Sequence, residues 1–269
     1  MAPRTRAASA AAAATCLLLD LSHDEVSIVT HELCDPLQPL LAVHLSSTAK
    51  GLQEAMEEQL AELKGQRQQV EALAVLCRWS CAQLRDAAGL RLGAGYDRPL
   101  TLAHWRTLGT LARSGSLPML DMLVINGSDN GDEGVALLAD GLRRGRMPSF
   151  RILALTEAQI GPQGATALAP ALTKRALPSL LELNLGGNQI GGAGLTALAP
   201  ALRQLPKLET LYLDNNQITD QGVASLLAPP TAGVLPSLEI LWLFNNQITD
   251  EGCAALASAL RGGALPALK

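Results

Sequence analysis

The sequence predicts an α/β solenoid, in which short parallel strands alternate with helices along one repetitive array, preceded by a small all-α N-terminal region. The first reason is a Leu-Pro or Met-Pro dipeptide that recurs with steps of 30, 30, 28, 30 and 30 residues, at Leu117, Met147, Leu177, Leu205, Leu235 and Leu265. A period held this closely is typical of repeat proteins. The second reason is a change of apolar spacing within each unit, and the third is a polar signature where that spacing changes.

The change of spacing is clearest in the last complete unit. Leu241 and Leu243 are two residues apart, which is the period of a strand with one buried face. Gly252, Leu256 and Leu260 then follow at steps of four, which is close to the helical period. Each unit is therefore expected to hold one strand, one turn and one helix.

The polar signature is an asparagine after the second strand leucine, present as Asn188, Asn216 and Asn246. The chain has to turn there, and the turn leaves backbone groups without partners in the sheet. A buried amide side chain both donates and accepts hydrogen bonds, so it can satisfy such groups. We expect these three asparagines to be structural.

The helix starts carry a second set of small and acidic residues. Gly194, Gly222 and Gly252 lie four residues after the isoleucine of their units, where a side chain is expected to collide with the strand layer. Asp220 and Asp250 lie just upstream, where free amides and the helix dipole favour a carboxylate.

Prolines interrupt the predicted helices. Pro170 and Pro200 fall within the Ala-rich runs of units two and three, and Pro229 and Pro230 take the same place in unit four. Proline inside a helix costs about 3 kcal/mol. We therefore expect short or kinked helices in these units.

The units fit the motif L-x-x-L-x-L-x-x-N-x-I-x-D-x-G, and over roughly residues 100–269 the chain resembles the ribonuclease-inhibitor type of leucine-rich repeat. Units three to five match closely. In the first two units Ser128 and Ala158 replace the asparagine, and Asn130 replaces the isoleucine. The resemblance implies a right-handed solenoid with a curved parallel sheet inside and helices outside. It also implies a concave face that binds proteins, and no shared enzymatic activity.

The first sixteen residues are Ala-rich, contain Arg4 and Arg6 and hold no acid. This composition predicts a disordered tail, although it also resembles a transit peptide. Residues 17–50 predict two helices separated by Pro36. They resemble an F-box at Leu21, Glu25, Val26, Leu33, Asp35, Pro36, Leu45, Ser46 and Lys50, with Ser22 where that family usually has proline. The alternative is a helical cap that shields the first repeat.

Residues 51–98 are predicted to form an amphipathic helical linker that breaks near Gly65, followed by a Gly-rich loop from Gly89 onward. The repeat domain is expected to span residues 99–269. It would begin with a helix-only half repeat over residues 99–116, because a solenoid needs its end covered. Leu265 to Lys269 match the opening of a further strand, so a truncated sixth repeat is expected at the other end.

Composition and charge exclude several classes of function. The formal net charge is -4, which argues against a nucleic-acid partner, and no apolar run is long enough for a membrane span. The five cysteines are odd in number and scattered, at Cys16, Cys34, Cys77, Cys81 and Cys253. They are typical of reduced thiols in the cytoplasm or nucleus. No metal site, cofactor or catalytic motif is predicted, so the chain is expected not to be an enzyme.

Binding residues are expected at strand positions that the core does not use, because side chains alternate between the two faces of a strand. The predicted partner-binding set is Met122, Val124, Ile152, Glu182, Asn184, Tyr212, Asp214, Ile240, Trp242 and Phe244. Its three aromatic residues predict a binding hot spot for a protein or peptide, unless further repeats or another part of the chain cover them. Glu182 and Asp214 would suit a basic segment of the partner. If the F-box resemblance holds, residues 17–50 would instead dock the adaptor of a cullin-type ubiquitin ligase.

Overall fold

The computed structural model describes residues 65, 67–78, 80–93, 100–145, 147–228 and 234–269. The chain divides into two compact units, Met1–Ala74 and Val75–Lys269. In the first unit the described residues are helical, and Val70 and Leu73 are buried, as the predicted amphipathic helix requires. The Ala-rich tail and the F-box-like segment lie outside the described residues.

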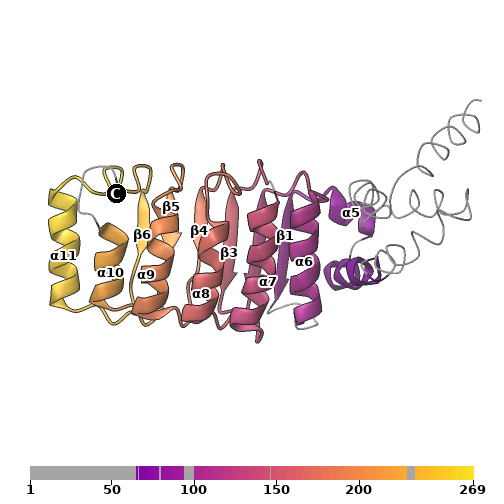
Figure 1. Cartoon of the computed structure of the whole chain (residues 1–269), viewed down its shortest axis with the longest axis horizontal. Coiled ribbons are helices and arrows are strands. Elements are labelled where there is room, and N and C mark those ends of the chain that lie inside the picture. Colours follow the sequence, from indigo (N-terminus) through magenta and orange to yellow (C-terminus); the bar gives the residue numbers. More distant parts are fainter. Residues whose placement is uncertain (1–64, 66, 79, 94–99, 146, 229–233) are drawn as a thin grey trace, which may run out of the picture. The chain divides into compact units, whose positions relative to one another are not determined.

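The second unit alternates strands and helices (Figure 1). Its strands are β1 (Gly89–Gly93), β2 (Met122–Asn126), β3 (Ile152–Thr156), β4 (Glu182–Asn184), β5 (Thr210–Tyr212) and β6 (Ile240–Trp242). Its helices are α5 (Cys81–Arg85), α6 (Leu102–Ser114), α7 (Gly131–Arg144), α8 (Pro162–Leu168) with the 3-10 turn η1 (Ala169–Ala171), α9 (Gly191–Leu202), α10 (Asp220–Leu227) and α11 (Asp250–Arg261). Each strand pairs in parallel with the next, in the order β1 to β6. The predicted α/β class and parallel sheet are confirmed.

Strand β1 lies where the sequence predicted a loop, and that prediction was wrong. Leu90 and Leu92 are buried and pair with Leu123 and Ile125 of β2. Helix α6 therefore follows a strand, and the array does not open with the expected helix-only half repeat. Gly93 ends the strand with φ +106°, and a Cβ there would lie 2.9 Å from the backbone nitrogen of Asn126. The glycines that suggested a loop permit this close approach of two strands.

The core lies between the sheet and a single row of helices on one of its faces (Figure 1). Leu183 and Leu211 on the strands and Leu198 and Leu226 on the helices are completely buried. Burying a leucine stabilises the fold by about 2 kcal/mol. Because side chains alternate along a strand, the residues between the buried leucines face away from the helices.

The glycines near the helix starts serve contacts between neighbouring repeats, and the expected collision with the strand layer was wrong. A Cβ on Gly194 would lie 2.7 Å from the Ile190 side chain of its own turn and 3.1 Å from the Cβ of Ala165 on α8. In the first repeats the equivalent Gly134 faces the Trp105 indole, at 2.8 Å. These glycines let successive helices pack closely.

The prediction of short helices at the prolines is confirmed for α8 but not for α9. Helix α8 has seven residues and continues into the 3-10 turn that contains Pro170. Helix α9 contains Pro200 in its last turn and has twelve residues, the same length as α11, which contains no proline. Helix α10 ends at Leu227, ahead of Pro229 and Pro230, which lie outside the described residues.

The repeat asparagines tie each turn to the one before it. Asn188 is almost fully buried; its Oδ1 accepts hydrogen bonds from the amides of Ala158 and Ile160 at 3.0 and 3.1 Å. Its Nδ2 donates to the carbonyls of Leu155 and Leu185, at 2.7 and 2.8 Å. Asn216 and Asn246 repeat this arrangement on the next two turns. The Asn216 side chain accepts the Ile190 amide and donates to the Leu185 carbonyl. The Asn246 side chain accepts the amides of Asn216 and Ile218 and donates to the Leu213 carbonyl.

The first repeats, which lack this asparagine, use other polar contacts. The Ser128 hydroxyl accepts a hydrogen bond from the buried Trp105 indole at 3.3 Å. Asn130 takes over part of the bridging role, because its Nδ2 donates to the carbonyl of Leu100 in the preceding repeat. The sequence departures from the motif are thus compensated locally.

Candidate functional site

The candidate site is the face of the sheet that points away from the helices, which we call the strand face. Its residues occupy the first, third and fifth positions of successive strands. Pairing aligns Met122, Ile152, Glu182, Thr210 and Ile240 in one row, and Arg91, Val124, Ala154, Asn184, Tyr212 and Trp242 in the next. Asp214 and Phe244 lie two residues further along, after β5 and β6. Every predicted binding residue belongs to this surface.

The most exposed apolar part of the strand face is an aromatic cluster of Tyr212, Trp242 and Phe244. The ring centroids of Tyr212 and Trp242 are 4.6 Å apart with an interplanar angle of 65°, so the rings meet edge to face. Those of Trp242 and Phe244 are 5.5 Å apart at 52°. Trp242 is 47% exposed and Phe244 50% exposed. The rings therefore pack against each other while leaving large apolar areas in contact with water.

Two carboxylates lie next to this cluster. Glu182 and Asp214 are half-buried on β4 and just after β5. Burial raises the pKa of the Tyr212 phenol, and the negative charges of Glu182 and Asp214 raise it further. The aromatic cluster therefore lies in a negative electrostatic environment.

The other end of the strand face is less exposed. Met122, Val124 and Ile152 are half-buried, and Ala154 between them is buried. Arg91 is an exposed residue of β1 that the sequence reasoning missed, because its segment was expected to be a loop; its guanidinium lies 3.8 Å from the Met122 sulfur. The signal that could have identified it is the alternation of Leu90 and Leu92 around it.

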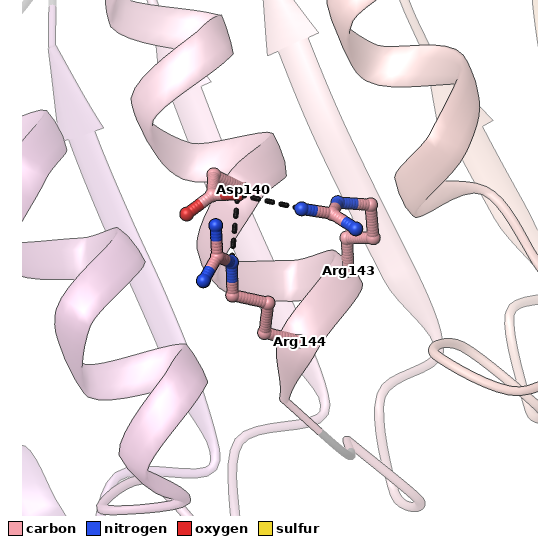
Figure 2. Close-up of polar contacts among 3 residues, drawn as sticks. All are labelled: Asp140, Arg143 and Arg144. Atoms are coloured by element: carbon pink, nitrogen blue, oxygen red, sulfur yellow. Dashed lines mark hydrogen bonds and ion pairs between the residues drawn. The ribbon is translucent and has the colours of Figure 1, made fainter.

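The helix side of the repeats carries a group of paired surface charges on α7. Asp140 Oδ1 pairs with Arg143 at 3.0 Å and with Arg144 at 2.9 Å (Figure 2). Partial desolvation would raise the pKa of Asp140, but the hydrogen bonds and charges of the two arginines outweigh this effect and lower it. The charge of Asp140 is thus compensated within α7 itself.

An open depression of about 480 Å³ lies beside the residues that precede β2 to β5. It is lined by Met119, Asp121, Ser149, Arg151, Ser179, Leu181 and Lys207. The lining contains no histidine or cysteine, and its acidic and basic side chains are spread over several repeats.

The titratable groups elsewhere have structural explanations. Burial raises the pKa of the Cys77 thiol to about 11, which keeps it protonated at neutral pH. His104 is an N-terminal residue of α6 whose Nδ1 lies 3.1 Å from the Thr101 amide, and partial burial lowers its pKa. Among the residues that the structure describes, no group of three or more His, Cys, Asp or Glu side chains could hold a metal ion. Within the same residues no helix combines the length and hydrophobicity needed to cross a bilayer.

Comparison with protein families agrees with this geometry. The family model for a leucine-rich repeat matches residues 146–169, and the model for two copies of leucine-rich repeats matches 178–225 and 206–257. The chain therefore contains leucine-rich repeats, and β4 to β6, α9, α10 and the first part of α11 lie within the matched segments. These matches do not extend to residues 17–50 and do not distinguish the ribonuclease-inhibitor type, so both finer resemblances stay predictions.

Comparison with known sequences and structures adds little beyond the fold. No curated protein sequence matches the chain. A structure of the leiomodin-1 actin-binding site 2 is 18% identical, with a TM-score of 0.45, over 63% of this chain and 90% of that one. An internalin from Listeria monocytogenes is 19% identical, with a TM-score of 0.28, over 73% of this chain and 62% of that one.

Proposed function

We propose that the chain is a non-catalytic scaffold that binds another polypeptide on the strand face. The observation that carries the proposal is the exposure of the aromatic cluster on a surface that the helices leave uncovered. Large exposed aromatic rings reduce solubility, and they are also the residues that dominate protein-binding hot spots. The presence of leucine-rich repeats supports the same function, because their stacked strands create extended binding surfaces.

The rigidity of the strand face also supports the proposal. Tyr212 and Trp242 lie on paired strands whose following turns are joined by the Asn246 hydrogen bonds to Asn216 and Ile218. The aromatic side chains are thus held in place before a partner arrives. A preorganised surface loses less conformational entropy on binding, which strengthens affinity.

The proposal is tested by affinity capture with the full chain, its Trp242→Ala variant and an Arg144→Ala control on the helix side. We expect Trp242→Ala to weaken the affinity for the partner by about 2 kcal/mol, which raises the Kd by a factor of roughly thirty. The Arg144→Ala control should bind the partner as the wild type does. Thermal unfolding should be similar for all three proteins, because both substituted side chains are exposed. Equal recovery by Trp242→Ala and the wild type would contradict a binding role for the strand face.

The F-box-like pattern of residues 17–50 supports an alternative, in which the chain is the substrate-recognition subunit of a cullin-type ubiquitin ligase. The repeats would then present the substrate, and the free thiols Cys77, Cys81 and Cys253 agree with a cytoplasmic location. The test is co-purification of a cullin and its adaptor with the full chain. A Leu33→Asp substitution should abolish recovery of the cullin while partners of the strand face remain bound. Failure to recover any cullin would leave the scaffold role alone.

A further inference from the structure

We propose that the aromatic cluster, together with Glu182, Asn184 and Asp214, receives an arginine side chain of the bound polypeptide. This inference rests on the proposed scaffold function and adds the chemistry of the ligand to it. It follows from three features of this part of the strand face: carboxylates without cationic partners among the described residues, an oriented acceptor oxygen, and the neighbouring exposed aromatic rings.

The two carboxylates lack cationic partners in the part of the chain that the structure describes. Among the described residues neither Glu182 nor Asp214 forms a salt bridge. The strand-face positions of β2 to β6 include no lysine or arginine. Arg91, the basic residue on this face, lies three strands away from Glu182, about 14 Å at the usual strand spacing. A cation from a partner would therefore find uncompensated negative charge that is only partly hydrated.

Gly186 takes the place of Asp214 in the preceding repeat and allows two acceptor oxygens to lie close together. A Cβ on this buried residue would lie 3.0 Å from Asp214 Oδ1 and 3.3 Å from Asn184 Oδ1, so a side chain here would crowd both oxygens. Asn184 Oδ1 accepts the Gly186 amide at 3.0 Å. Asp214 Oδ2 is held by the side-chain amide of Asn215 at 2.9 Å, which orients the carboxylate. Among the described residues Asp214 Oδ1 accepts no hydrogen bond, so it can accept one from a partner.

The aromatic ledge favours arginine over lysine. A guanidinium is planar, stacks on aromatic rings and carries five N–H donors, whereas an ammonium is a compact and strongly hydrated charge. Glu182 and Asp214 lie close enough to Tyr212 for their charges to act on its phenol, and the Tyr212 ring meets Trp242 edge to face. Tryptophan is the strongest aromatic partner for a cation. A flat side chain can therefore contact the rings and the carboxylates at the same time.

The test uses the full chain and three matched Gly-Ser peptides that carry paired arginines, lysines or citrullines at the same positions. Binding is followed by NMR through the indole N–H resonance of Trp242, assigned with a Trp242→Phe variant. The buried indole of Trp105 serves as an internal reference for an intact core. We expect the arginine peptide to shift the Trp242 resonance and to bind about tenfold more tightly than the uncharged citrulline peptide, with lysine in between.

Charge-neutral variants separate the contributions. Glu182→Gln and Asp214→Asn should each weaken the arginine peptide severalfold, and added salt should weaken the wild-type complex. Glu133→Gln removes the same charge from an exposed position on α7 and should change nothing. If Glu133→Gln weakens binding as much as Glu182→Gln, the effect is one of net charge and the proposed receptor is wrong.

The remaining outcomes distinguish this inference from the scaffold function. Equal shifts of the Trp242 resonance with all three peptides would overturn the preference for arginine and leave the strand face as a binding surface. Binding of the arginine peptide that moves resonances of the helices, with Trp242 unaffected, would count against both proposals. Absence of any arginine binding would overturn the inference alone, since capture of a partner through Trp242 tests the scaffold role separately.

Discussion

The carboxylate of Asp220 accepts two hydrogen bonds from Thr249 of the next repeat, one from its amide at 2.8 Å and one from its hydroxyl at 2.6 Å. The sequence suggested only that Asp220 suits its own helix start. In the structure the same carboxylate also holds the start of α11, and in an earlier repeat Asp132 Oδ1 accepts the Gly161 amide at 2.7 Å. An acid at this position therefore joins one helix start to the next.

This contact predicts a dependence of stability on acid. The hydrogen bonds from the side chain and backbone of Thr249 lower the pKa of Asp220 below the ordinary aspartate value of 3.8. A carboxylate whose pKa is lower in the folded state stabilises the protein above the unfolded pKa, and this stabilisation is lost as the pH falls through the folded pKa. The free energy of unfolding of Asp220→Asn and of the wild type is measured in urea at neutral pH and again below pH 4. At neutral pH the variant should be less stable than the wild type. Below pH 4 this difference in stability should shrink. An equal difference at both pH values would contradict the role of the Asp220 charge.

His104 predicts a loss of stability in a different pH window. Its Nδ1 lies 3.0 Å from the Thr101 hydroxyl and 3.1 Å from the Thr101 amide, and partial burial lowers its pKa from 6.5. The folded state binds the proton less readily than the unfolded state, so stability decreases as the pH falls through 6.5 and below. Glutamine at this position can cap the helix without titrating. His104→Gln should therefore remove the pH dependence in thermal unfolding between pH 7 and pH 5, and an unchanged slope would show that His104 is not its source.

Asn188 is expected to be one of the most sensitive positions of the repeats. Asn188→Ala would leave the amides of Ala158 and Ile160 buried without an acceptor. Two such losses should cost about 3 kcal/mol or more, measured by urea unfolding. Asn184→Ala is the matched control on the strand face, where the lost side chain bonds only the nearby Gly186 amide, and it should cost less than about 1 kcal/mol. Similar costs for the two variants would contradict the structural role of Asn188.

The contact between α6 and α7 predicts a severe effect of a single methyl group. A Cβ on Gly141 would lie 2.5 Å from the Cα of Gly109, so backbone meets backbone where the two helices cross. Gly141→Ala should destabilise the array by about 2 to 3 kcal/mol, because neither helix can move aside without disturbing the core. Gly65→Ala provides the control, since a Cβ there meets nothing within 4 Å, and it should be neutral or slightly stabilising. Thermal unfolding of both variants gives the comparison.

Sequence reasoning identified the repeats because each unit has the same pattern of apolar residues. A strand spacing of two, as at Leu241 and Leu243, is followed by a helical spacing. The same alternation placed Tyr212 and Trp242 side by side on one face, and their exposed rings agree with that placement. Strand β1 was missed because it begins and ends with a glycine, at Gly89 and Gly93. Its partner residue also follows after 33 positions, as Leu90 to Leu123, instead of the usual 30.

What could not be predicted are the contacts between neighbouring units. The partner of Asp220 is 29 residues away, and its identity depends on the stagger of adjacent helix starts. The packing of Gly194 against Ala165 depends on the same stagger. The close approach of Gly186 to the side chains of Asn184 and Asp214 is likewise visible only when these residues are placed in space. Periodicity within a unit indicates its elements, whereas these details require coordinates.

The asparagine hydrogen bonds have a direction along the array, since each side chain serves the turn before its own. Asn246 accepts hydrogen bonds from the amides of Asn216 and Ile218 in the preceding turn, and it donates to the carbonyls of Leu243 and Phe244 in its own. The loss of one asparagine should therefore loosen two neighbouring turns at once. A substitution in one repeat would thus disturb the binding surface of the repeat before it as well as its own.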